Sequence, residues 1–173
     1  YEIPKRDWSS DVCSSDLDHL VTPALLKNGD QQQKSLVLWN AKTGEAVAKA
    51  PSLQVNSLVA SPDGQWIAEG GADKRLRIRS GKNLELQNEF RAHDGPVTGL
   101  AWHPRLPILA TASGSSVRLW NTKTWEMLEE IQLDNFWEAP PLLDIPGEEG
   151  HRLFVTVHNL ISIFEPASFQ KTP

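Results

Sequence analysis

The sequence predicts an all-β fold made of repeated units of short strands, and three observations lead to this class. Residues 38–45 (LWNAKTGE) and residues 119–126 (LWNTKTWE) agree at six of eight positions, 81 residues apart. Residues 55–71 (VNSLVASPDGQWIAEGG) align with residues 97–113 (VTGLAWHPRLPILATAS) through shared Val, Leu, Pro and Ala positions. Apolar and polar residues alternate over short stretches, and no helical period persists. We therefore expect repeats of about 40 residues, each built from strands.

Each repeat is expected to hold four short strands. They are predicted at residues 55–60, 66–70, 76–79 and 84–90 in one repeat, and at 97–102, 108–113, 117–120 and 127–131 in the next. The turn Pro62–Gly64 separates the first two strands, because proline presets φ and glycine accepts a positive φ. A later repeat begins with strands at 142–145, 153–157 and 161–164, whereas residues 19–50 form a repeat without its first strand. Four strands in about 40 residues are typical of a β-propeller blade.

The first seventeen residues do not fit this pattern. Residues 7–17 read DWSSDVCSSDL, a string rich in Ser and Asp with neither a strand period nor a helix period. It resembles the translation of a sequencing adapter, and residues 1–6 fit the adapter's upstream part. We therefore predict that residues 1–17 are an adapter-derived segment and not native protein, with a flexible native tail as the alternative.

The segment that follows, residues 18–173, is predicted to be a fragment of a propeller. Its blades are expected at about residues 18–50, 51–91, 92–133 and 134–173. This is three to four four-stranded antiparallel blades, fewer than the full ring that about four to eight blades usually make. An open ring exposes blade faces, so we expect the fragment to be marginally stable and to self-associate through them.

Composition and charge exclude several classes of protein. The chain of 173 residues is 39% hydrophobic with a formal net charge of −5, which excludes a disordered chain and argues against a nucleic-acid partner. No apolar stretch approaches the roughly 18 residues of a membrane span, so no membrane partner is expected. The single Cys13 cannot form an internal disulfide or a cysteine metal site. We expect a soluble piece in the cytoplasm, although the native N-terminus is not observable.

Several motifs resemble those of WD40 repeats. The Leu-Trp-Asn endings at 38–40 and 119–121, the turn at 60–64 and the pair Ala92-His93 carry the resemblance. It implies strands a to d in each blade, with strand d outermost, and a buried hydrogen-bonded group of His, Ser or Thr, Asp and Trp. His93, Ser113 and Trp120 match three of these places, while Gly114 or Ser115 stands where Asp is expected. His93 could then use Asp94 or a water instead.

The preceding blade shows the converse pattern. Asp73 is present there, but Pro51 and Arg79 occupy the His and Trp places. The residues that the resemblance assigns to a structural role in the repeats are Trp39, Asp73, His93, Ser113 and Trp120. We expect His93 to contribute to stability and not to catalysis.

A run of basic residues is the main charge feature. Arg75, Arg77 and Arg79 alternate with apolar residues, so they share one face of a strand. Acidic residues on adjoining strands could pair with this run, which also includes Lys74 and Lys82; the candidates are Glu69, Glu85 and Glu89. A salt-bridged blade face is the favoured interpretation, and a site for an anion, a phosphopeptide or nucleic acid is the alternative.

The function that fits best is a non-catalytic protein–protein interaction scaffold. No nucleophile, metal or cofactor motif appears, so we expect no enzyme activity, no bound metal and no cofactor. The alternative is a sensory or regulatory propeller of a larger enzyme, such as a bacterial protein kinase, whose catalytic part is missing. Its partner would be another protein or another domain of the same chain. The candidate contact residues lie in the loops that join blades and the turns between strands b and c: Gln54, Asn56, Lys74, Arg75, Asp94, Thr98, Phe136 and Trp137. The last two could instead cap the core between blades.

Overall fold

The strands form four antiparallel sheets in the computed structural model, which describes residues 13–15, 19–28, 31–52, 54–114, 116–133, 141–146, 151–157 and 160–169. We call these sheets blades 1 to 4. Blade 1 holds β1 (Cys13–Ser15), β2 (His19–Asn28), β3 (Gln31–Asn40) and β4 (Ala46–Pro51). Blade 2 holds β5 (Val55–Ala60), β6 (Trp66–Gly71), β7 (Arg75–Ser80) and β8 (Leu86–Arg91). Blade 3 holds β9 (Gly99–Trp102), β10 (Ile108–Ser113), β11 (Ser116–Asn121) and β12 (Met127–Gln132). Blade 4 holds β13 (Leu142–Asp144), β14 (Leu153–Val157) and β15 (Leu160–Phe164).

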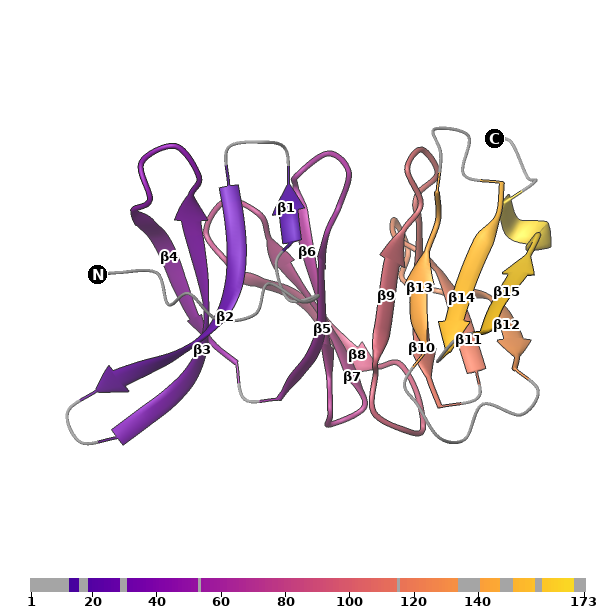
Figure 1. Ribbon diagram of the computed structural model, residues 1–173, viewed down its shortest axis with the longest axis horizontal. Coiled ribbons are helices and arrows are strands. Elements are labelled where there is room, and N and C mark those ends of the chain that lie inside the picture. The colour runs from indigo at the N-terminus through magenta and orange to yellow at the C-terminus, as the bar shows by residue number, and fades with distance from the viewer. Residues whose placement is uncertain are drawn as a thin grey trace.

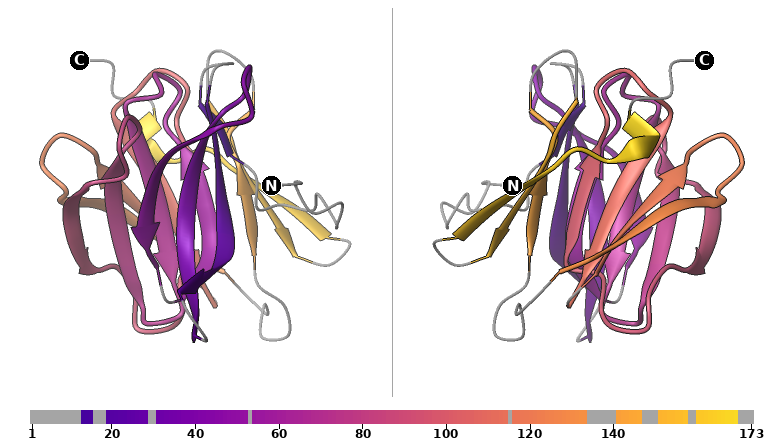
Figure 2. Two further views of the ribbon diagram at one scale, coloured as in Figure 1. Left: turned by 90° about the vertical axis from the view of Figure 1, so that its left-hand side faces the viewer. Right: turned by 90° about the vertical axis from the view of Figure 1, so that its right-hand side faces the viewer.

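Each blade is a meander whose strands pair in chain order, so the predicted all-β propeller class is confirmed. The blades stand side by side from indigo to yellow in Figure 1, and Figure 2 shows them stacked face to face. Predicted strands 55–60, 108–113 and 153–157 coincide with β5, β10 and β14. No helix in the described part of the chain is long and apolar enough to cross a bilayer.

The turns explain where strands begin and end. Between β5 and β6, Gly64 adopts a φ of 68° and its N–H donates to the carbonyl of Ser61, as the Pro-Asp-Gly turn predicts. The Ser61 hydroxyl accepts from the Trp66 N–H at 2.9 Å. Strand β8 begins two residues later than expected because Leu84 has a φ of 61°, which a strand does not allow. Trp125 holds the same place before β12, with a φ of 60°.

Blade 1 differs from the sequence expectation at both ends of β2. At its start, the short strand β1 pairs with β2 through Cys13 and Val21; β1 comes from residues 13–15, whereas residues 19–50 supply three strands, as expected. An unpaired strand edge accepts an extended segment through its free backbone groups. The adapter origin of residues 1–17 stays a prediction. Residues 1–12 and 16–18 lie outside the described part of the chain.

The hairpin of β2 and β3 is longer than any predicted strand pair. It extends over ten residue pairs, from His19 opposite Asn40 to Asn28 opposite Gln31, whereas β10 and β11 pair over six. Strand β4 pairs only from Ser35 onward, so the far end of the hairpin continues as a two-stranded arm. Figure 1 shows this arm projecting from the lower left of the molecule. Nothing in the repeat pattern predicts this arm.

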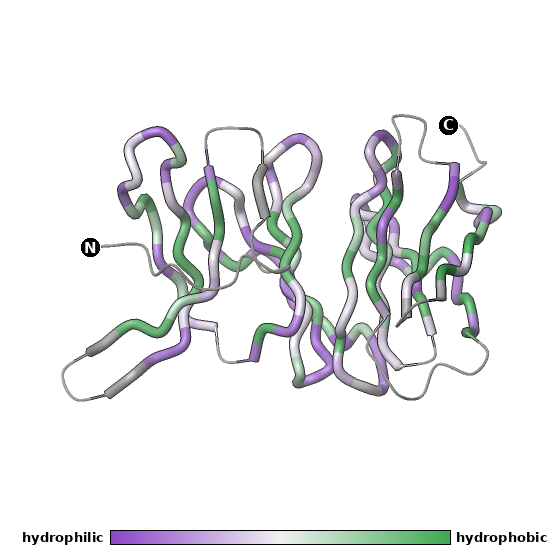
Figure 3. The backbone as a smooth tube through the Cα atoms, viewed as in Figure 1, coloured by the Kyte–Doolittle hydropathy of each residue, from purple (hydrophilic) through white to green (hydrophobic). Residues whose placement is uncertain are grey.

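In the part of the chain that the structure describes, the hydrophobic core lies between successive blades, as three clusters. One joins blades 1 and 2: Val21, Leu36, Leu38, Ala50, Leu58, Ala60, Ile67 and Leu84. The second joins blades 2 and 3: Ala68, Leu76, Ile78, Ala92, Val97, Leu100, Leu109 and Trp120. The third joins blades 3 and 4: Ala101, Ile108, Ala110, Ala112, Val117, Leu119, Leu133, Ile145, Leu153, Val155 and Phe169. Figure 3 shows the alternation of apolar and polar residues that creates these faces.

The blades approach closely where glycine faces the next blade. A Cβ added to Gly70 in β6 would lie 2.7 Å from Cγ1 of Val97, on the segment leading to blade 3. A Cβ on Gly99 would lie 2.6 Å from the carbonyl oxygen of Pro141, at the start of blade 4. Both separations are too short for carbon, so these two places require glycine for the observed spacing.

After β15 the chain turns back toward blade 3. The short 3-10 helix η1 (Ala167–Phe169) follows Pro166, and its Phe169 ring meets the His103 ring edge-on at 4.9 Å between centroids. The N–H and hydroxyl of Ser168 both donate to Glu129 Oε2 on β12, at 3.2 and 2.9 Å. The described residues therefore add no fourth strand to the edge of β15.

Candidate protein-binding surface

Blade 3 contains a buried hydrogen-bonded group around His93, which is 1% exposed. His93 Nε2 lies 2.7 Å from Thr111 Oγ1, and Trp120 Nε1 donates to the same oxygen at 2.9 Å. On the other side of the ring, His93 Nδ1 lies 3.5 Å from Ser116 Oγ. The hydroxyl at the centre of the group therefore connects the loop before β9 to strands β10 and β11.

This arrangement corrects the sequence assignment at one place. We expected Ser113 to supply the hydroxyl, but Thr111 supplies it, and Ser113 lies two residues further along β10, opposite Ser116. Both hydroxyls face the same side of the strand, because side chains alternate with a period of two. The sequence alone does not show which of the two hydroxyls contacts Trp120. The register of β10 against β11 decides this, because it places Thr111 diagonally across from Trp120.

Burial controls the protonation of His93. The low-polarity surroundings disfavour the imidazolium, and the nearby Arg118 guanidinium repels it, so the pKa of His93 is lowered from 6.5 to about 4. The ring is therefore neutral at pH 7. A neutral, buried ring held between two hydroxyls is suited to a structural role in the repeat.

Blade 1 has part of the same group. Trp39 Nε1 donates to Thr22 Oγ1 at 2.9 Å, as Trp120 does to Thr111. Trp39 pairs with Leu20 across the hairpin, and Trp120 pairs with Leu109 in the equivalent register. The predicted structural place of Trp39 therefore agrees with its observed contacts.

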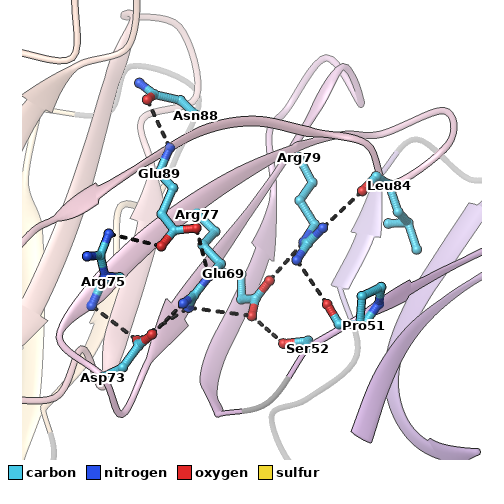
Figure 4. Close-up of polar contacts among 10 residues, drawn as sticks. All are labelled: Pro51, Ser52, Glu69, Asp73, Arg75, Arg77, Arg79, Leu84, Asn88 and Glu89. Atoms are coloured by element: carbon cyan, nitrogen blue, oxygen red, sulfur yellow. Dashed lines mark hydrogen bonds and ion pairs between the residues drawn. The ribbon is translucent and has the colours of Figure 1, made fainter. Parts of the chain in front are cut away.

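In blade 2 an ion pair stands where blades 1 and 3 have a tryptophan (Figure 4). Arg79 is 7% exposed and Glu69 is 0% exposed, and Arg79 Nε donates to Glu69 Oε2 at 2.9 Å. The guanidinium also donates to the carbonyls of Leu84 and Pro51, each at 3.1 Å. The Ser52 hydroxyl donates to Glu69 Oε1.

Two sequence assignments in this blade are thereby refined. Arg79 does occupy the Trp position, but Ser52 and not Pro51 takes the place of His93, because its side chain reaches the central residue on the second strand. That central residue is Glu69, where blade 3 has Thr111. Both members of the pair differ from their counterparts in blade 3, and in blade 2 a buried charge meets an opposite charge.

A ladder of ion pairs covers the outer part of the same face. Arg75 NH1 lies 3.0 Å from Glu89 Oε1, and Arg77 Nε lies 3.5 Å from Glu89 Oε2. Arg77 also contacts the carboxylate of Asp73, and this hydrogen bond keeps the pKa of Asp73 below its usual value. These contacts agree with the expected salt-bridged face. Glu85 differs, because it lies in the turn before β8, where its N–H donates to Asn83 at 3.2 Å.

The loops between blades are bonded through their backbones to neighbouring turns and strands. The Gln54 carbonyl accepts from the Ala72 N–H at 2.8 Å, and the Lys74 carbonyl accepts from the Ala92 N–H at 3.0 Å. The Thr98 N–H donates to the Ala112 carbonyl at 2.9 Å. These backbone bonds hold the loops and turns of blades 2 and 3 together at one end of the sheets.

Six of the predicted contact residues lie at this end. Gln54 and Asn56 are exposed, Thr98 and Lys74 are partly exposed, and Asp94 and Arg75 have side chains that are 85% and 48% exposed. Asp94 accepts from Arg91 at 2.9 Å and lies 3.9 Å from Arg118. Phe136 and Trp137 lie outside the described residues. We call the remaining set the loop surface: Gln54, Asn56, Lys74, Arg75, Asp94 and Thr98.

The described residues also form a small cavity away from the loop surface. It has a volume of about 220 Å³ and lies where the ends of β5, β9 and β13 converge. Trp102 forms part of its wall and donates to the Val59 carbonyl at 3.3 Å. Among the described residues, no group of three or more His, Cys, Asp or Glu side chains is placed to hold a metal ion.

Comparisons with known proteins agree with this architecture. The family described as WD domain, G-beta repeat matches residues 46–80 and 84–121. Actin-interacting protein 1 of Drosophila melanogaster is 33% identical over 97 residues, covering 49% of this chain and 16% of that protein. The WD repeat-containing protein VIP3 of Arabidopsis thaliana is 30% identical over 115 residues, covering 64% of this chain and 36% of that protein. The chain thus spans about a third or less of these curated relatives.

Two solved structures share the fold. The structures of U3-55K and of the RRP9 WD40 repeats each superimpose with a TM-score of 0.67 at 19% identity. Each covers 92% of this chain, whereas the chain covers 53% and 52% of theirs. This chain is therefore a partial WD40-repeat protein, as its repeated strands, Trp-hydroxyl pairs, matched repeats and propeller fold together indicate.

Proposed function

We propose that the chain is a non-catalytic scaffold that binds another protein, or another domain of its own polypeptide, through the loop surface. The observation that carries the proposal is the set of backbone bonds that hold the loops of blades 2 and 3 against their neighbouring turns. Exposed polar side chains on a backbone already fixed in this way lose little conformational entropy on binding. WD-repeat relatives make a scaffold role the natural first hypothesis for such a surface.

The charges on this surface favour a protein over a nucleic acid. Arg75 of the loop surface, and Arg91 and Arg118 beside its Asp94, each contact a carboxylate within 3.0 Å, so the charge of these three arginines is largely compensated. A surface that binds phosphates needs uncompensated cations. One human relative is named WD repeat and HMG-box DNA-binding protein 1, and that name belongs to the whole of a protein of which this chain covers 10%. A cytoplasmic location is part of the present proposal.

The proposal is tested by affinity capture with quantitative mass spectrometry, using the chain and a loop-surface variant carrying Lys74→Glu, Arg75→Glu and Asp94→Lys. We expect that the proteins captured by the parent chain are not captured by this variant. Lys123→Glu is the matched control, because Lys123 is exposed in the turn between β11 and β12, at the opposite end of the blade. Equal capture by the loop-surface variant and the control would refute the proposed surface.

A further inference from the structure

The arm of the β2–β3 hairpin has a face that is both apolar and basic. Pro23 pairs with Leu36, and Leu25 pairs with Lys34, so these side chains share one face of the hairpin. Leu36 is 0% exposed, because blade 2 covers the face at that point. Leu25 is 60% exposed, and Pro23 and Lys34 are also exposed. We call Pro23, Leu25 and Lys34 the arm face.

The arm face lies on the side of blade 1 that packs against blade 2. Side chains two residues apart in a strand point the same way, so the arm face continues the row that contains Val21 and Leu38. Both of these residues are buried in the cluster between blades 1 and 2. Figure 1 shows the arm at the end of the sheets where the chain enters β5. Blade 2 already occupies this side of blade 1, so the arm face is not a place where a further blade would pack.

Backbone bonds join the base of the arm to the loop surface. The Ser52 N–H donates to the Lys34 carbonyl at 3.2 Å. Two residues further along the chain, the Gln54 carbonyl accepts from the Ala72 N–H at 2.8 Å. The turn that contains Ala72 leads to Lys74, which belongs to the loop surface. The arm face and the loop surface are therefore neighbouring parts of the same end of blades 1 and 2.

Two lysines at this end have uncompensated charges. Within the described part of the chain, no hydrogen bond or ion pair involves the ammonium group of Lys34 or that of Lys74. The carboxylate of Asp73, one residue before Lys74, is bound to Arg77 instead. Two free ammonium groups beside an exposed leucine are complementary to a ligand that presents carboxylates next to an apolar side chain.

We propose that the arm face binds an acidic, apolar peptide segment of the partner protein, with an apolar side chain on Pro23 and Leu25 and an Asp or Glu at Lys34. This inference rests on the proposed function and extends it, because the same partner would continue onto the loop surface. Leu25 supplies an apolar contact that the loop surface lacks, since the members of that surface are all polar. A nucleic-acid strand fits this face less well, because the arm face has no aromatic ring on which a base could stack.

The probe is a phage-displayed library of random dodecapeptides, selected against the immobilised full chain. We expect the enriched peptides to combine Asp or Glu with a nearby Leu, Ile or Phe. The most enriched peptide is synthesised, and its dissociation constant is measured by fluorescence polarisation. Lys34→Glu and Leu25→Ser should each weaken its binding by about tenfold or more, since each removes one of the two complementary contacts. Lys49→Glu and Val47→Ser are the matched controls, because both residues are exposed on β4 and neither belongs to the arm face.

Charge reversal separates recognition from a general loss of structure, and circular dichroism verifies that each variant is folded. A peptide whose Asp and Glu residues are replaced with Lys should bind the Lys34→Glu variant more tightly than it binds the parent chain. The inference is overturned if no peptide is enriched, if the enriched peptides lack acidic residues, or if the arm variants bind as the controls do. Affinity capture keeps the two proposals apart. If the loop-surface variant loses the captured proteins whereas Lys34→Glu and Leu25→Ser retain them, the inference fails and the proposed function stands.

Discussion

The buried pair of Glu69 and Arg79 allows a sharp test of how blade 2 is stabilised. Replacing Arg79 with Trp removes the cation that contacts Glu69 Oε2 at 2.9 Å and leaves a carboxylate of 0% exposure. Removing one partner of a buried pair costs about 3–5 kcal/mol. We expect the lower end, about 3 kcal/mol, because Arg77 NH1 stays 4.0 Å from Glu69 Oε1. The double variant with Glu69→Thr reproduces the residues of blade 3 and should recover most of this loss.

The assay is urea denaturation followed by circular dichroism, since the added tryptophan would disturb a fluorescence signal. The free energies of unfolding of the parent, both single variants and the double variant form a double-mutant cycle. We expect a coupling energy of about 2 kcal/mol or more, because each single variant leaves one buried charge without its main partner. If the losses in the free energy of unfolding of the two single variants simply add up in the double variant, the two residues act independently. Glu69 and Arg79 would then not replace the Thr and Trp of blade 3 as a coupled pair.

Four further outcomes follow from the same structure. His93→Ala should lower the free energy of unfolding by about 1–3 kcal/mol, measured by urea denaturation, while capture of partners by the folded chain stays unchanged. The free energy of unfolding should fall by about 3 kcal/mol in total as the pH drops from 6.5 to about 4, because the unfolded chain binds a proton on His93 that the folded chain does not. His93→Gln should flatten this part of the profile of stability against pH. An equal slope in the parent chain and the variant would contradict the role of His93. Thr111→Val should cost more stability than Ser113→Ala, since Thr111 serves both His93 and Trp120; the reverse order in thermal melts would restore the original assignment. Gly70→Ala should cost about 1–3 kcal/mol through its overlap with Val97, and Val97→Ala in the same chain should recover part of that loss if the overlap is the cause.

Local sequence was sufficient wherever a strand or turn depends on neighbouring residues. The alternation in residues 55–60 and the Pro-Asp-Gly turn after them led to β5 and its turn without any tertiary information. The start of β8 was misplaced because Leu84 adopts a positive φ, which is rare for leucine. It does so because its side chain is 1% exposed in the core between blades 1 and 2, and this burial offsets the backbone strain.

The buried polar groups needed the register as well as the sequence. His93 and Trp120 were assigned from their repeat positions, whereas the choice of Thr111 over Ser113 depends on which residue of β10 lies opposite which residue of β11. Ser52 is not found by aligning the repeats, because it lies 17 residues before Glu69 whereas His93 lies 18 residues before Thr111. The long hairpin of β2 and β3 has no signal in the repeats, since no other blade contains it within the described residues.

The core formed by the described residues is divided into three clusters, one between each pair of neighbouring blades, and we expect this division to determine the order in which the blades unfold. Each cluster joins only adjacent sheets, so the outer blades 1 and 4 should unfold before blades 2 and 3. Within the described part of the chain, blades 2 and 3 have a packed neighbour on both sides, whereas blades 1 and 4 each have one. Amide protons of β6, β7, β10 and β11 should therefore exchange with solvent last, and those of β15 among the first.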